Sequence, residues 1–186
     1  MKCEPLKSCS REEFETLPGD YSGALLVDSA VLESAENCEK IRKRTAANQR
    51  IIIQDLASPT MTRLIPAESR KLQLEFQSFI FQRCEKLSAL GVKEFSLVFD
   101  FKRAAADPDF YRQLKIVLRS CFGILENNHL TLLLTVYAAA EEQPGEKWFT
   151  QFRQDLLYPR IGFLVFAPEP MVSRFILPEL PKEALS

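Results

Sequence analysis

Three aspartates directly follow apolar runs of this sequence, and carboxylates are groups that bind hard cations or transfer protons. Asp28 closes the run 24–28, Asp55 closes 50–55 and Asp100 closes 94–100. If these runs are parallel strands, their ends meet at one edge of a sheet, where three carboxylates could bind a divalent cation. Alternatively, each aspartate accepts hydrogen bonds from the following loop or caps a helix. We favour the second interpretation, because no histidine accompanies them, and predict no cofactor.

Other polar residues occur at the same predicted strand ends. Lys102 and Arg103 could hold a phosphate or carboxylate group, and with Tyr137 they would form a site for a small anionic metabolite. The alternative is that both basic side chains lie in a solvated loop. No catalytic residue is assigned, and the candidate ligand-binding residues are Asp28, Gln54, Asp55, Asp100, Lys102, Arg103 and Tyr137.

The other residues whose side chains could act in catalysis or metal binding are predicted to have structural roles. His129 is the only histidine, and it precedes a predicted strand, at the end of a barrel associated with stability. The serines lack a Gly-x-Ser-x-Gly elbow and the glycines are too dispersed for a phosphate-binding loop. The five cysteines include no CxxC pair, and Cys84 and Cys121 fall in helical patterns as small buried hydrophobes.

Charge and hydropathy exclude several partners. The net charge is −1, and the one basic run, Lys40 to Arg44, is predicted to be a solvated helix face, so no nucleic-acid binding is expected. No apolar run approaches the roughly 20 residues that span a bilayer, so no membrane partner is expected. The first residues lack the apolar segment of a signal peptide, and a cytoplasmic location is predicted.

The predicted elements alternate between strand and helix. Strands are expected at 24–28, 50–55, 94–100, 131–137 and 161–166, at the separations of βαβ units. Helices are expected after Ser10, whose spacing to Glu13 fits a capping box, and over 33–48, 68–90, 107–128 and 147–157. Gly91 ends the third of these five helices.

We therefore predict a single α/β domain over residues 1–186, with a helical lead-in over 1–21 and a proline-rich tail over 167–186. About five parallel strands with outer helices would form a partial barrel of the TIM type, since a complete one takes about 250 residues. The alternative is an open doubly wound sheet, in which the strand order reverses and helices cover both faces.

Two segments resemble a known superfamily. Ala89–Phe95 and Gly123–Leu134 are similar to the middle of xylose-isomerase-like TIM barrels, a group that includes sugar-phosphate isomerases, epimerases and AP endonucleases. The resemblance covers about residues 70–137 and implies the fold. Catalytic members carry a metal-binding Glu at the end of the fourth strand. The equivalent stretch here, 134–138, has no carboxylate, so the metal-dependent activity does not carry over.

Three functions remain open at this point. We predict a non-catalytic or degenerate member of this barrel group that acts through protein contacts. The alternatives are a metal-assisted sugar-phosphate isomerase or epimerase using the three aspartates, and a binding module for a small anionic metabolite. A five-stranded portion would leave 24–28 and 161–166 as edge strands, so we also predict a homodimer. Phe79, Ile80 and Phe81 widen the apolar stripe of their helix, which could contact a partner.

Overall fold

Seven strands form one sheet, and their order in space follows their order in the chain. The structure is a computed structural model that describes residues 6–55, 69–98, 101–137, 146–156, 158–167 and 169–173. Strands β1 to β6 pair in parallel and β7 pairs with β6 in antiparallel. The strands are β1 (Lys7–Cys9), β2 (Leu25–Asp28), β3 (Ile51–Asp55), β4 (Glu94–Val98), β5 (Thr131–Tyr137), β6 (Ile161–Ala167) and β7 (Glu169–Ser173).

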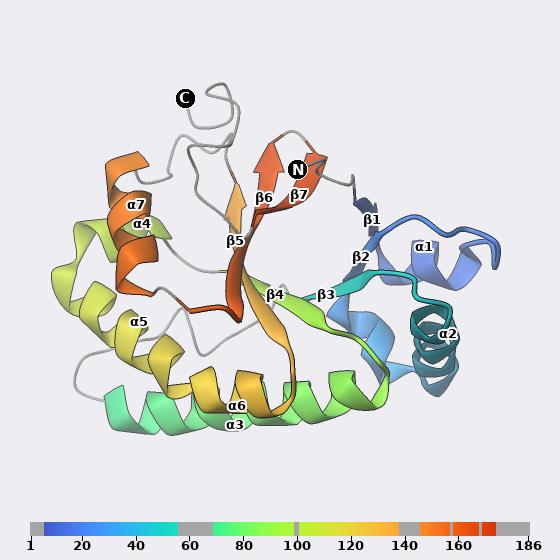
Figure 1. Cartoon of the computed structure of the whole chain (residues 1–186), viewed down its shortest axis with the longest axis horizontal. Helices are drawn as coiled ribbons and strands as arrows, with labels where there is room; N and C mark the ends of the chain where they lie inside the picture. Colours follow the sequence, from blue (N-terminus) through green and yellow to red (C-terminus); the bar gives the residue numbers. More distant parts are fainter. Residues whose placement is uncertain are drawn as a thin grey trace.

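Helices connect the successive parallel strands, as such crossovers require. They are α1 (Arg11–Thr16), the 3₁₀ helix η1 (Ser29–Glu33), α2 (Ala35–Ala46), α3 (Ser69–Ala89), α4 (Phe101–Ala106), α5 (Pro108–Ser120), α6 (Phe122–Asn127) and α7 (Glu146–Asp155). Figure 1 shows the helices placed around the outside of the sheet. The helices that connect successive parallel strands therefore lie on one outer side of the sheet, as in a TIM barrel.

Local sequence explains where these helices begin and end. The Ser10 hydroxyl accepts from the Glu13 amide while the Glu13 carboxylate accepts from the Ser10 amide, which is the predicted capping box. Asp107 caps α5, with Pro108 at the first position, where its missing amide hydrogen costs nothing. Gly91 follows α3 with φ +72°, a conformation that glycine adopts without strain. These signals confirm the predicted helix boundaries to within a few residues.

The strand order distinguishes the two predicted architectures. A doubly wound sheet requires a reversal of strand order, and the order β1 to β7 contains none. The doubly wound alternative is therefore wrong, and the sheet is that of a partial barrel with outer helices. The five predicted strands are confirmed, each with a boundary shift of at most two residues.

Two strands were not predicted, and they change the edges of the sheet. β1 is only three residues long with the sequence Lys-Ser-Cys, too short and polar for a recognisable pattern. β7 contains Pro170, and proline is compatible with an edge strand even though it cannot donate to a ladder. Because β1 pairs with β2 and β7 pairs with β6, the prediction that β2 and β6 are edge strands is wrong.

The two sides of the sheet contact different layers. Buried residues of α2, α3, α5 and α7, such as Ile41, Phe76, Leu114 and Phe152, join strand residues such as Phe95 in the main hydrophobic core. The opposite, inner side of the sheet holds a separate apolar cluster of Leu6, Ala24, Leu26, Ile52, Leu133 and Leu164. Strand residues alternate between these sides because successive side chains point in opposite directions.

Three helical details differ from, or add to, the sequence prediction. The helix expected over 107–128 is interrupted at Cys121, so that α5 and α6 are separate. Lys102 and Arg103 lie in helix α4, and the prediction of a solvated loop there is wrong. Cys84 and Cys121 are fully buried as predicted, and burial raises the pKa of each thiol to about 12.

Helix α3 spans 21 residues, but within the described parts of the chain no helix combines the length and apolar character needed to cross a bilayer.

Candidate functional site

A row of polar side chains crosses the inner side of the sheet near the carboxyl ends of the strands. Asp28 of β2 pairs in register with Gln54 of β3, and Gln54 pairs with Ser96 of β4. Thr135 of β5 lies on the same side, two residues beyond Leu133, which pairs with Ser96. In parallel α/β folds this end of the strands is where ligands bind. We refer to Gln54, Ser96 and Thr135 as the inner polar row.

The inner polar row is buried without hydrogen-bond partners. Gln54 is 7% exposed, Ser96 0% and Thr135 1%. Gln54 Nε2, Ser96 Oγ and Thr135 Oγ1 make no hydrogen bond with any of the described residues. Buried polar groups are nearly always paired with protein or with ordered water, because an unmade hydrogen bond costs about 1–3 kcal/mol. Three such groups on consecutive strands are therefore candidates for pairing with ordered water or with a polar ligand.

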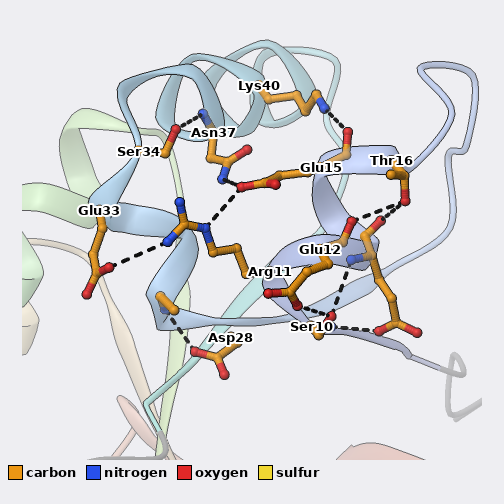
Figure 2. A network of polar contacts seen from close by, with 12 residues as sticks. Ser10, Arg11, Glu12, Glu15, Thr16, Asp28, Glu33, Ser34, Asn37 and Lys40 are labelled. Atoms are coloured by element: carbon orange, nitrogen blue, oxygen red, sulfur yellow. Dashed lines mark hydrogen bonds and ion pairs between the residues drawn. The ribbon is translucent and has the colours of Figure 1, made fainter.

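Asp28 is used as a helix cap at the edge of this row. Its Oδ1 accepts a hydrogen bond of 2.8 Å from the Ala30 amide, at the start of η1. Figure 2 shows this contact beneath a polar network in which Arg11 reaches both Glu15 and Glu33, and Asn37 donates to Glu15. The capping interpretation predicted for strand-end aspartates therefore applies to Asp28, whose side chain remains half-buried.

Asp55 faces the helices and not the inner side. It pairs in register with Leu97, which belongs to the helix-facing core. Its Oδ2 lies 2.5 Å from Arg83 Nη2 of α3, and its Oδ1 accepts from the Ser29 hydroxyl at 3.2 Å. Arg83 Nε makes no hydrogen bond and is buried. The pair is thus a buried ion pair that ties β3 to α3.

The predicted carboxylate cluster does not form between Asp28 and Asp55. They lie on opposite sides of the sheet, since Asp28 neighbours Gln54 while Asp55 neighbours Leu97. The part of the chain that the structure describes holds no group of three or more His, Cys, Asp or Glu side chains able to bind a metal. Asp100, the third predicted member, lies outside the described residues.

The other predicted ligand-binding residues are described only in part. Arg103 stacks over the ring of Phe110 with its guanidinium 4.4 Å from the ring centroid, a contact between α4 and α5. Lys102 lies in α4 and Tyr137 ends β5, and both side chains fall outside what the structure describes. Ligand binding by these residues stays a prediction.

Ser96, Thr135 and Arg83 are site residues that the sequence reasoning missed. Strand alternation contained a signal for the first two, because a hydroxyl within Glu94–Val98 and another within Thr131–Tyr137 fall at positions facing away from the helices. No local signal marked Arg83, since its partner Asp55 is distant in sequence.

The amino-terminal ends of the strands hold a second, differently charged site. Arg50 pairs with Glu94 through two contacts, Nε to Oε2 at 2.6 Å and Nη2 to Oε1 at 2.8 Å. A pocket of about 300 Å³ surrounds this pair and is also lined by Lys93, His129 and Arg160. His129 has φ +53° just after α6, where it ends the helix before β5. Its predicted position at the strand entrance is confirmed.

Solved structures show which class of fold this is. D-Psicose 3-epimerase with D-tagatose from Clostridium cellulolyticum H10 superposes with a TM-score of 0.63 and 9% identity, over 87% of this chain and 63% of that one. L-Ribulose 3-epimerase gives 0.62 and 11%, over 88% and 60%. A xylose isomerase domain protein from Planctomyces limnophilus gives 0.56 and 14%, over 88% and 63%.

The fold is therefore that of a partial TIM barrel, and the solved structures that it resembles include sugar 3-epimerases and a xylose isomerase domain protein. The fold implied by the resemblance of Ala89–Phe95 and Gly123–Leu134 is confirmed. The chain spans less than two thirds of the length of these neighbours. No protein-family model matches the sequence, and no curated protein matches it.

Proposed function

We propose that this chain is a non-catalytic member of the xylose-isomerase-like barrels and acts through protein contacts. The observation that carries the proposal is the use of the described strand-end carboxylates. Asp55 is held by Arg83 in the helix-facing layer and Asp28 caps η1. The stretch ending β5 contains Thr135, Val136 and Tyr137, with no carboxylate where the resemblance implies the metal-binding Glu. This strand, β5, is the one that the sequence analysis counted as the fourth, because β1 was not predicted.

The surface where α3 meets α5 supports the second half of the proposal. Among described residues, the large hydrophobic side chains that are most exposed are Leu74 (59%), Phe81 (45%) and Ile116 (45%). Gln77 Nε2 donates to the Ser120 carbonyl at 3.0 Å, which joins the two helices. Leu74 and Phe81 lie three and four residues from Gln77, and Ile116 lies four from Ser120, so all three flank this contact. Apolar side chains gathered in this way are typical of protein contacts.

Two measurements test the proposal separately. Purified protein with Mg²⁺, Mn²⁺ or Co²⁺ should convert neither D-tagatose nor D-fructose, as followed by chromatography of the sugars. Formation of an epimer at a rate proportional to protein concentration would refute the non-catalytic assignment. Sedimentation equilibrium at micromolar concentration should show a homodimer, now expected through this helical surface and not through a sheet edge, and Leu74→Ser with Phe81→Ser should weaken it. A monomer of 21.3 kDa would refute self-association and leave the catalytic result standing.

The inner polar row favours a second candidate function, the binding of a small hydroxyl-rich ligand without turnover. The unpaired Gln54 amide and the Ser96 and Thr135 hydroxyls are groups that pair with sugar hydroxyls. One neighbour, a D-psicose 3-epimerase, was solved with D-tagatose. Calorimetric titration with D-tagatose tests this candidate: saturable heat that disappears in Ser96→Ala supports it, and the absence of saturable heat at millimolar sugar rejects it.

A further inference from the structure

The basic run Lys40 to Arg44 does not behave as the solvated face that its composition predicts. Arg44 is only 6% exposed, although it lies in the last turn of α2. The sequence prediction is therefore wrong for Arg44. Arg42, two residues earlier, follows the prediction, since it is exposed and pairs with Glu39 of the same helix. The basic run therefore contains an exposed residue, Arg42, and a buried one, Arg44.

Arg44 is a buried cation whose hydrogen bonds all go to uncharged acceptors. Nη1 donates to the Tyr21 carbonyl and to Gln49 Oε1, both at 2.9 Å. Nη2 donates to the Pro18 carbonyl at 2.6 Å and lies 3.4 Å from that of Leu17. No described carboxylate forms an ion pair with it, and Nε makes none of these bonds. A buried charge is costly unless it is paired, so this site favours an incoming anion.

A pocket opens beside this guanidinium. It has a volume of about 410 Å³, within the range of small-molecule sites. Two more cations line it, Lys40 and Lys43, against a single carboxylate, Asp20, so that the lining side chains carry a net charge of +2. Lys40 is held in place by a hydrogen bond of 2.5 Å from Nζ to the Glu15 carbonyl, visible in Figure 2. Tyr21, Ser22 and Gln49 supply polar groups of the lining.

The helix dipole alone does not explain this arrangement. Basic residues in a last helical turn usually lie over the carbonyl groups of their own helix. The bonds of Arg44 instead go to the Leu17, Pro18 and Tyr21 carbonyls and to Gln49, all outside α2, while Arg44 also lines the pocket. We propose that this pocket binds a small molecule bearing a dianionic phosphate group. Its net charge of +2 matches a dianion, and guanidinium and ammonium groups are the side chains that bind phosphate. The site is independent of the inner polar row.

The experiment is a calorimetric titration of the full chain at pH 7.5 with glycerol 3-phosphate. We expect saturable binding of one ligand per chain. Lys43→Gln should weaken it about tenfold, because one charged hydrogen-bonding partner is lost from an exposed position where folding is not at risk. Arg42→Gln is the matched control, since Arg42 neighbours Lys43 but does not line the pocket, and it should change affinity less than twofold. Arg44 itself is unsuitable, because its loss would free the loop that it holds.

Three further arms distinguish the ligand chemistry. Inorganic phosphate should bind the same site, and glycerol should not. Malonate, a dianion of different geometry, should bind more weakly than glycerol 3-phosphate. Affinity for the phosphate ester should fall as the pH drops below about 6, where its second ionisation is reversed. The proposal is overturned if no saturable heat appears up to 10 mM ligand, if Lys43→Gln binds as well as the parent, if Arg42→Gln weakens binding equally, or if malonate binds as tightly.

Discussion

The helix-facing side and the inner side of this sheet contain different side chains, although the same strands supply both. On the helix-facing side, apolar residues such as Phe95 and Leu132 fill the core, and the polar exception, Asp55, has Arg83 as its partner. On the inner side, a small apolar cluster adjoins Gln54, Ser96 and Thr135, which are buried with unpaired polar atoms. The first side pairs its buried charges with each other, although Arg83 Nε makes no hydrogen bond there, whereas the second side holds three uncharged polar atoms without a described partner. We therefore expect stability to depend mainly on the first side, and the second side is the candidate for ligand recognition proposed above.

The largest effect should come from a cavity on the helix-facing side. Phe95 is fully buried in β4, and Phe95→Ala should lower the free energy of unfolding by about 3–5 kcal/mol, because both transfer energy and packing are lost. Urea unfolding followed by circular dichroism measures it. The control is Phe81→Ala on the 45% exposed surface of α3, which should cost less than about 1 kcal/mol. If Phe95→Ala and Phe81→Ala lowered the free energy of unfolding equally, Phe95 would contribute no more to stability than a surface residue.

The next largest effect concerns the buried ion pair between Arg83 of α3 and Asp55 of β3. Arg83→Met should cost about 3 kcal/mol, since it leaves Asp55 charged and buried without its partner. Arg112→Met, which breaks an exposed pair with Asp109, is the control and should cost about 0.5 kcal/mol or less. The double variant Asp55→Leu with Arg83→Met should recover most of the loss. If Arg83→Met unfolds at the same urea concentration as the parent, Asp55 does not depend on this partner.

A backbone substitution tests the junction between α3 and β4. Gly91 has φ +72°, and a Cβ there would lie 2.8 Å from Thr45 Oγ1. Gly91→Val should therefore cost about 1 kcal/mol or more, from strain and from displacement of Thr45, which donates to the Leu90 carbonyl. Gly123→Ala in α6 is the control, because no atom lies within 4 Å of its added Cβ, and it should be neutral or stabilising. An unchanged melting temperature for Gly91→Val would contradict the predicted helix-to-strand junction.

The helix-facing side was largely predictable from sequence, and the inner side was not. Apolar strands and amphipathic helices have characteristic periodicities, so β2 to β6 could be predicted. Gly91 could be predicted as the end of α3 because it directly follows the helical pattern. β1 and β7 were missed because a three-residue polar strand and a strand containing proline are defined by pairing with a neighbour. The interactions of Asp55 and Arg44 were likewise unpredictable, since Arg83 and the carbonyls of residues 17–21 approach them only through the tertiary fold.

The smallest effect, and the one of opposite sign, belongs to the inner polar row. Ser96 Oγ and Thr135 Oγ1 are buried without a hydrogen-bond partner among the described residues, so each carries a desolvation cost that no described group offsets. Ser96→Ala and Thr135→Val should therefore leave stability unchanged or raise it by about 1 kcal/mol, in contrast to Phe95→Ala and Arg83→Met on the helix-facing side. The control is Ser120→Ala, because the Ser120 hydroxyl donates to the Val117 carbonyl at 2.6 Å and its loss should not stabilise the protein.

If Ser96→Ala and Thr135→Val instead lose 1 kcal/mol or more in the ligand-free protein, the inner polar row is satisfied by ordered water and is a structural feature. If they stabilise the free protein and abolish its stabilisation by added sugar, the row is a ligand site, and stability on this side of the sheet has been exchanged for recognition.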